Sequence, residues 1–117
     1  MRRGEIWTVA GGPDCAGKPR PVVIVQDDRF AETNSVTVCL LTTNEVEAPL
    51  VRLLVEASLE NGLRGASRLM VDKMASIPRT KLGARVGRLS DDDAVRLNGA
   101  MVVFLGLASG APRPGNG

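Results

Sequence analysis

Few types of side chain are available for acid–base catalysis or metal binding, because the 117-residue chain contains no histidine and no tyrosine. Histidine is the residue that most often serves as a general base, a proton shuttle or a metal ligand near neutral pH. Its absence excludes Ser-His-Asp triads and zinc sites that use histidine. Proton transfer and charge stabilisation therefore fall to carboxylates, hydroxyls, lysine, arginine or bound water.

The two cysteines, Cys15 and Cys39, have no metal-ligand spacing, and both are predicted to be small packing residues. No apolar stretch approaches the roughly 18 residues needed to cross a bilayer. The N-terminal residues also lack the apolar run of a signal peptide. The sequence predicts a cytoplasmic protein, in which the thiols stay reduced and no metal or other cofactor is bound.

Basic residues are concentrated in one part of the chain. Residues 26–60 hold seven acidic residues and two arginines, a net charge of −5, whereas residues 64–88 hold seven basic residues and one aspartate, a net charge of +6. Such a basic segment indicates a polyanionic partner, but solvated charges on the surface of a small domain give the same pattern.

Short strands account for most of the chain. Pro19 and Pro21 hold Arg20 in an extended conformation directly before the buried strand predicted at residues 22–25. Further strands are predicted at residues 5–10, 35–43 and 50–56, with one or two more in residues 63–77 after the turn signal Asn61-Gly62. Residues 81–89, interrupted by glycine, are either a weak strand or an extended linker.

A helix is predicted from Asp91 to about Leu107, with Ser90 as its cap and three aspartates in its first turn. Its apolar stripe should pack on the sheet. The chain length predicts one domain with one core over residues 1–109, followed by a flexible tail at residues 110–117. The expected fold is α+β, a small and partly open antiparallel β-barrel with a C-terminal helix.

A collinear series of motifs resembles the MazF/PemK family of toxins over residues 2 to 107. The series begins with Arg-Gly-Glu-Ile-Trp at residues 3–7 and Gly-Lys-Pro-Arg-Pro at residues 17–21. It continues with the Thr-Thr pair at residues 42–43, Leu-Met-Val-Asp at residues 69–72, Gly-Arg-Leu-Ser at residues 87–90 and the final helix. The resemblance implies an SH3-like barrel, a homodimer and an antitoxin partner.

The resemblance also implies metal-independent, ribosome-independent cleavage of single-stranded RNA at short sequence motifs, leaving a 2′,3′-cyclic phosphate and a 5′-hydroxyl. Arg20 matches the family's catalytic arginine, and its planar fork suits a phosphate that gains charge. Thr42 matches the catalytic threonine, although a strand-end threonine can be purely structural. Asp72 matches an acidic residue of the PemK/Kid branch and either acts as a base or pairs with Arg68 or Lys73.

Further candidates for RNA binding are basic or hydroxyl side chains expected to add affinity rather than base choice. They are Lys18, Thr43, Arg64, Arg68 and Lys73. Trp7 is one of three aromatic residues and is expected in the core rather than stacked on a base.

Two departures from the family patterns weaken the PemK/Kid-like catalytic trio. No histidine precedes Arg20, and Met70 stands where that branch has an arginine two residues before Asp72. Arg68 is a hypothetical substitute, since positions 68, 70 and 72 share one face of a regular strand. The alternatives to an endoribonuclease are a CcdB-like gyrase-poisoning toxin with the same barrel and a non-catalytic nucleic-acid-binding barrel.

Overall fold

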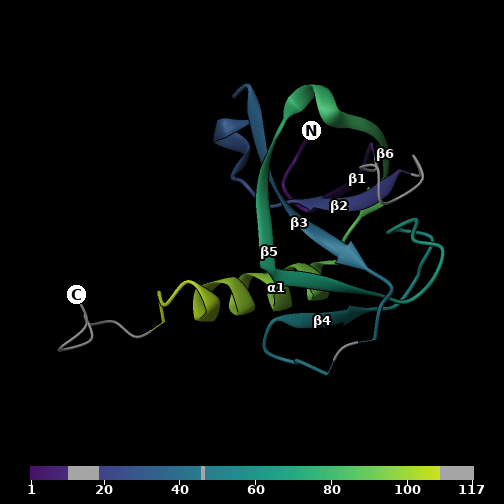
Figure 1. Ribbon diagram of the computed structural model, residues 1–117, viewed down its shortest axis with the longest axis vertical. Helices are drawn as coiled ribbons and strands as arrows, with labels where there is room; N and C mark the ends of the chain where they lie inside the picture. Colours follow the sequence, from purple (N-terminus) through teal and green to yellow (C-terminus); the bar gives the residue numbers. More distant parts are fainter. Residues whose placement is uncertain (11–18, 46, 109–117) are drawn as a thin grey trace.

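The computed structural model describes residues 1–10, 19–45 and 47–108 (Figure 1). The strands are β1 (Glu5–Val9), β2 (Arg20–Ile24), β3 (Ser35–Thr42), β4 (Arg52–Val55), β5 (Ser67–Pro78) and β6 (Leu82–Arg88); the helix is α1 (Asp91–Phe104), and two 3-10 helices are η2 (Asp28–Phe30) and η3 (Arg79–Lys81). The predicted strands are confirmed. Within residues 81–89, for which a weak strand or an extended linker was expected, Leu82–Arg88 form strand β6. The predicted tail at 110–117 lies outside the described residues, and the domain boundary at 109 stays a prediction.

Among the described residues, six strands form one antiparallel sheet in the order β4-β5-β3-β2-β1-β6. The sheet curls, so that β1, β2 and β6 lie in one half of the molecule and β4 lies with α1 in the other half, while the long strands β3 and β5 connect them (Figure 1). The α+β fold class with its partly open barrel is confirmed.

The register between β3 and β5 shifts in the middle of the two strands. Cys39 pairs with Met74, whereas the next residue, Leu40, pairs with Met70. Residues 71–73 of β5 are therefore in a bulge, and bulges bend a strand and change where its side chains point. The bulge lets one continuous strand of 12 residues serve both halves of the molecule.

The sheet buries residues on both of its faces, so the prediction of a single core is wrong. The larger cluster comprises Ile6, Val23, Val25, Cys39, Leu41, Val55, Leu69, Val71, Leu89 and Leu97. The smaller cluster comprises Val22, Ile24, Val36 and Val38, with Trp7 and other half-buried residues packed around it. Successive residues of a strand point to opposite faces, so the continuous apolar run of β2 supplies both clusters.

Two predicted packing residues behave as expected. Cys39 is fully buried, and its burial raises the pKa of the thiol to about 12, which keeps it protonated and inert. Trp7 packs against the smaller cluster and its Nε1 donates a hydrogen bond to Glu5 Oε1 at 3.1 Å. Cys15 lies outside the described residues.

The loop between β4 and β5 folds back onto β6. The Asn61 side chain accepts hydrogen bonds from Ser58 N and Leu63 N and donates one to the Glu56 carbonyl, which fixes the turn. A Cβ atom on Gly87 would lie 2.4 Å from the Glu60 carbonyl oxygen, so only glycine allows this approach. The loop thereby covers part of β6, an outer strand of the sheet.

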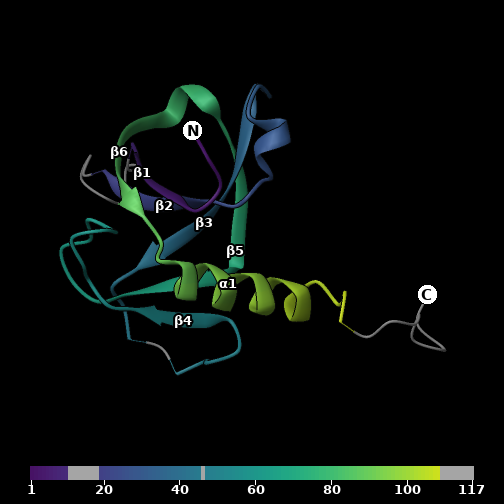
Figure 2. The same ribbon diagram turned by 180° about the vertical axis from the view of Figure 1, so that it is seen from behind.

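Helix α1 crosses the sheet beside β4 and the neighbouring end of β5, as Figure 2 shows from behind. The Ser90 hydroxyl accepts a hydrogen bond from Asp93 N at 3.1 Å, which confirms the predicted cap. The predicted apolar stripe comprises Ala94, Leu97, Met101, Phe104, Leu105 and Ala108. Of these, Leu97 is buried, but Phe104 and Leu105 are exposed. None of the described helices is long and apolar enough to span a membrane.

The helix ends at Phe104, before the predicted end near residue 107, because Gly106 adopts a left-handed conformation with φ of 75°. Gly106 N donates to the Val103 carbonyl and Leu107 N donates to the Val102 carbonyl. These two bonds form a Schellman motif, which satisfies the last carbonyls and stops the helix.

Candidate active site

Arg20 and Thr42 lie at the ends of neighbouring strands. Val22 of β2 pairs with Leu40 of β3, and continuing this antiparallel register by two residues brings Arg20 opposite Thr42. Adjacent strands are about 4.8 Å apart, so both side chains border the same space. That space is a pocket of about 210 Å³, lined by Arg20, Pro21, Leu41, Thr42, Thr43, Asn44 and Ser67.

The Thr42 hydroxyl is oriented by the turn that follows β3. Its Oγ1 accepts a hydrogen bond from the backbone N–H of Asn44 at 3.1 Å. A hydroxyl has one proton and two lone pairs, so this bond leaves the proton free to be donated. Thr42 is half-buried and can present that proton to a group in the pocket.

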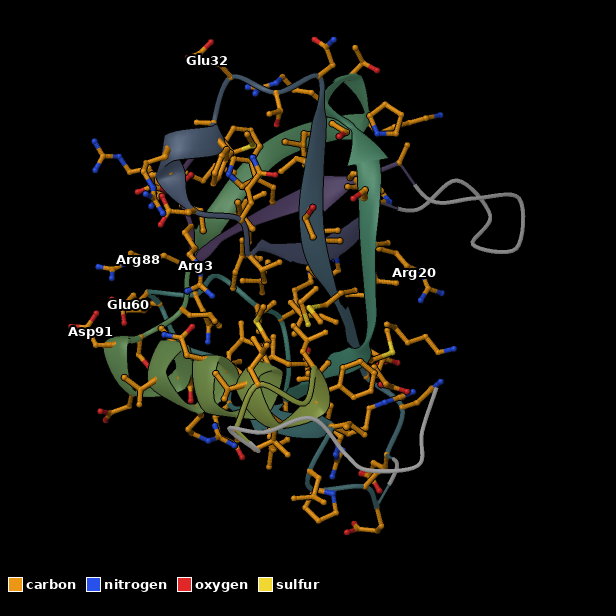
Figure 3. All side chains as sticks on the ribbon, turned by 90° about the vertical axis from the view of Figure 1, so that its left-hand side faces the viewer. Arg3, Arg20, Glu32, Glu60, Arg88 and Asp91 are labelled. Atoms are coloured by element: carbon orange, nitrogen blue, oxygen red, sulfur yellow. The ribbon has the colours of Figure 1, made fainter. Side chains whose placement is uncertain are left out.

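Arg20 is exposed, and within the described part of the chain its side chain makes no ion pair or hydrogen bond. In Figure 3, Arg20 lies on one side of the molecule, and Arg3, Glu60, Arg88 and Asp91 lie on the other. Unlike Arg20, Arg88 has carboxylate partners, Glu60 and Asp91. A guanidinium without a protein carboxylate keeps its donors available for an anionic ligand.

A second pocket adjoins the first and shares Arg20, Pro21 and Leu41 with it. It has a volume of about 190 Å³ and is lined by Val9, Ala10, Arg20, Pro21, Val22, Leu40, Leu41 and Met70. Apart from Arg20, none of these lining side chains can donate a conventional hydrogen bond. Arg20 therefore stands on the boundary between a polar pocket and an apolar pocket.

Asp72 pairs with Arg52 of the neighbouring strand β4. Arg52 Nε and NH2 donate to its two carboxylate oxygens at 2.9 and 3.1 Å. These hydrogen bonds hold the pKa of Asp72 below its ordinary value. The expected partners, Arg68 or Lys73, are therefore wrong: β4 pairs with β5 and brings Arg52 beside the bulge that contains Asp72.

Three arginines line a further pocket of about 230 Å³ beside β4. Arg68 is half-buried and stands directly opposite Thr42 on β3 and Leu54 on β4. The remaining lining residues are Glu47, Ala48, Pro49, Arg52, Leu53, Leu54 and Arg96. Arg96 is held in place, since its NH1 donates to the Leu54 carbonyl at 2.8 Å and to Asp93 at 2.7 Å.

The other predicted RNA contacts are distributed differently. Thr43 lines the polar pocket beside Arg20. Arg64 and Lys73 are exposed, and neither lines a pocket beside Arg20. Lys18 lies outside the described residues. In the part of the chain that the structure describes, no group of three or more Cys, Asp or Glu side chains is placed to hold a metal ion.

The sequence of residues 2–105 matches the family model of PemK-like, MazF-like toxins of type II toxin–antitoxin systems. The chain belongs to this family. The match includes every residue of the pockets beside Arg20.

Known relatives of this toxin agree with the assignment. A probable endoribonuclease MazF of Mycolicibacterium smegmatis (strain ATCC 700084 / mc(2)155) is 51% identical over 108 residues, which cover 92% of this chain and 99% of that protein. A solved structure described as an endoribonuclease in complex with its cognate antitoxin, from mycobacterial species, has a TM-score of 0.74 at 23% identity, covering 97% and 99% of the two chains. The Mycobacterium tuberculosis toxin MazF-mt6 has a TM-score of 0.70 at 26% identity, covering 86% and 96%.

Several residues of the toxin's pockets were missed by sequence reasoning. Arg52 lies in a predicted strand, but its segment is acidic overall and gave no signal of a basic site. Arg96 lies in the helix, where its proximity to β4 depends on tertiary packing. Met70 was expected only as the position of a missing arginine, and its place in the wall of the apolar pocket depends on the pairing of β3 with β5.

Proposed function

We propose that this toxin is an endoribonuclease that cuts single-stranded RNA, with Arg20 and Thr42 acting together on the scissile phosphate. The single observation that carries the proposal is that one pocket is lined by an oriented hydroxyl and by an arginine side chain with no partner among the described residues. The curated relative from Mycolicibacterium smegmatis, a probable endoribonuclease, supports the same reaction class.

The proposed reaction is a transesterification within the RNA backbone. The ribose 2′-oxygen attacks the phosphorus, the bond from phosphorus to the 5′-oxygen breaks, and the products carry a 2′,3′-cyclic phosphate and a 5′-hydroxyl. Arg20 binds the phosphate through two N–H groups and stabilises the charge that its oxygens gain in the transition state. Thr42 donates its free proton to a phosphate oxygen as a hydrogen bond and aligns the group.

The proton of the 2′-hydroxyl passes to water in this proposal, and water protonates the departing 5′-oxygen. Among the described residues, no carboxylate lines the pocket that holds Arg20 and Thr42. We assign Asp72 a positioning role through Arg52, since its bidentate pair and lowered pKa make it a weak base. The proposed reaction requires no metal ion.

The remaining basic side chains contribute affinity for the RNA backbone. Arg68 is half-buried and pairs with Thr42 across β3 and β5, which supports a role for its side chain in binding the RNA backbone near Thr42. We propose Arg68, Arg64, Lys73 and Lys18 as phosphate contacts and Thr43 as a further contact in the polar pocket. Contacts of this kind weaken as salt concentration rises, because bound phosphates release counterions.

We also propose that the toxin acts in the cytoplasm, forms a homodimer and is bound by a cognate antitoxin. Homodimerisation is implied by the family resemblance. The solved endoribonuclease described as a complex with its antitoxin supports the antitoxin partner. Analytical ultracentrifugation of the purified toxin tests the dimer, and a sedimenting species of one chain mass at micromolar concentration would contradict it.

The nuclease proposal is tested with a long single-stranded RNA in the presence of EDTA. Discrete fragments with 5′-hydroxyl and 2′,3′-cyclic phosphate ends are expected. Cleavage that disappears in EDTA contradicts the metal-independent reaction. Intact RNA together with inhibited DNA supercoiling by gyrase would favour a CcdB-like mode of action, and salt-sensitive RNA binding without cleavage would favour a non-catalytic barrel.

A further inference from the structure

Arg20 lines two adjoining pockets that differ in the chemistry they offer a ligand. The polar pocket is formed at the ends of β2, β3 and β5, and the apolar pocket lies towards β1 and the side chain of Met70. Their volumes of about 210 and 190 Å³ are similar to each other. Both are below the roughly 300 Å³ at which sites for drug-sized molecules begin, so each suits one small planar group.

Asn44 gives the polar pocket unused hydrogen-bonding groups. Its side-chain amide is exposed and has no partner among the described residues. An amide presents a donor and an acceptor side by side, the arrangement that reads the edge of a nucleobase. Ser67 Oγ donates to the Gly65 carbonyl at 3.1 Å and so keeps its lone pairs for a donor in the pocket.

The apolar pocket can recognise a ligand by van der Waals contact and shape rather than by hydrogen bonds. Val9, Val22 and Leu40 line it, and Met70 forms part of its wall from the neighbouring strand β5. A thioether packs well against an aromatic ring, and its long side chain limits the size of the group that enters. Selection in this pocket therefore depends on size and fit.

We propose that the two pockets bind the two bases that flank the phosphate held by Arg20. Asn44 selects the base in the polar pocket by hydrogen bonds, and Met70 selects the base in the apolar pocket by shape. The inference rests on the proposed nuclease function and extends it to the residues that determine the cleavage motif.

The side chain of Asn44 can be replaced without removing the hydrogen bond that orients the Thr42 hydroxyl. The bond that orients Thr42 comes from the backbone N–H of Asn44, which is retained when the side chain is replaced. Asn44→Ala should therefore alter base preference while cleavage itself continues. Asn44→Asp keeps the shape and removes both amide donors, so it should alter the preference at the same position.

The chain supplies a matched control at the other end of the same strand. Asn34 precedes β3, is exposed, and is separated from Asn44 by the length of that strand, roughly 25 Å at about 3.3 Å per residue. Asn34→Ala should leave the cleavage motif unchanged. For the apolar pocket, Met70→Ala enlarges the space, and Met70→Leu approximately conserves the volume if the smaller variant fails to fold.

The experiment digests an RNA library of random sequence and determines the cleavage ends by sequencing. A lost bidentate base contact lowers discrimination on the order of tenfold or more, so Asn44→Ala should lose that much preference at one position adjoining the cut. The Met70 variants should change the preference on the other side of the cut. The Asn34→Ala motif should equal that of the wild type.

The outcomes separate this inference from the proposed function. If the wild-type toxin makes no cuts, the proposed function fails and the inference fails with it. If the wild type cuts and Asn44→Ala retains the full motif, only the inference is overturned. A change at the same position in the Asn44 and Met70 variants would also overturn it, because the two pockets would then bind one base.

Discussion

Arg52 on β4 and Asp72 on β5 form a two-point ion pair, with donor–acceptor distances of 2.9 and 3.1 Å. Hydrogen bonds from Arg52 are the largest cause of the lowered pKa of Asp72. The pair connects the outer strand β4 to the bulge in β5. It also lies beside Arg68, with which Arg52 lines the pocket next to β4.

The first prediction concerns the pH dependence of this pair. The pKa of Asp72 is lower in the folded protein than its ordinary value of 3.8, so the pair stabilises the fold above that pH. The contribution falls as pH drops below about 3.8 through the folded-state pKa. Asp72→Asn should lower the melting temperature at pH 6, and its difference from the wild type should shrink at pH 3. Thermal unfolding followed by circular dichroism measures this, and a difference that stays constant with pH would contradict the assignment.

Arg20→Ala should abolish RNA cleavage while leaving the fold intact. Arg20 is exposed and its replacement removes no buried contact, so the melting temperature should change little. Removing a charge-stabilising donor costs roughly 100- to 1000-fold in rate, and Arg20 supplies two such donors in the proposed reaction. Arg20→Lys should recover little activity, because an ammonium lacks the planar fork. Near wild-type cleavage by Arg20→Ala would remove Arg20 from the mechanism.

Thr42→Val should reduce cleavage, whereas Thr42→Ser should retain most of it. Valine has nearly the shape of threonine but cannot donate to a phosphate oxygen, and about a 100-fold loss of single-turnover rate is expected. The substitution also removes the acceptor for Asn44 N, so the unfolding temperature of each variant must be measured alongside the rate. If Thr42→Val cuts as fast as Thr42→Ser, the hydroxyl has no catalytic role.

Gly87→Ala should destabilise the toxin markedly. The added Cβ would lie 2.4 Å from the Glu60 carbonyl oxygen and 2.5 Å from Asn61 backbone atoms, so the loop between β4 and β5 would have to move. Overpacking of this kind costs about 1–3 kcal/mol. Urea denaturation gives the free energy of unfolding, and an unchanged midpoint would show that the loop does not press on β6.

Gly99→Ala in α1 should have the opposite effect. Gly99 is exposed in the middle of the helix, and nothing lies within 4 Å of a Cβ built there. Alanine is favoured over glycine in a helix interior by roughly 1 kcal/mol, so the free energy of unfolding should rise by about that amount. A decrease would mean that the middle of α1 is closely approached by another molecule, such as a second copy of the chain.

Local features of the sequence predicted their structures well. The Ser90 hydroxyl caps α1 as predicted, by accepting a hydrogen bond from Asp93 N three residues later. The Asp93 carboxylate accepts instead from Arg96 NH1, so it does not complete a capping box. The prolines around Arg20 place it at the start of β2, where the family resemblance had put a catalytic arginine. Such features need no knowledge of which strands pair.

Features that depend on strand pairing could not be predicted in the same way. The partner of Asp72 follows from the pairing of β4 with β5 and from the bulge at residues 71–73. The second core arises because β2 and β3 are covered on both faces. In contrast, the end of α1 could have been predicted from the sequence, because Gly106 is a helix-stop signal. The predicted end near residue 107 was too late because the apolar stripe continues past Gly106.

The pairing of β1 with β6 joins a strand that is synthesised early to one that is synthesised late. Glu5 pairs with Arg88, and Leu89 N donates to the Gly4 carbonyl, so the first strand is completed by residues synthesised near the end of the chain. β2, which carries Arg20, pairs with β1. A chain emerging at about 5–20 residues per second therefore exposes Arg20 well before the strands that fix its position are complete. We therefore expect RNA cleavage only from toxin chains whose synthesis has passed β6, because β1 lacks one of its two partner strands until then.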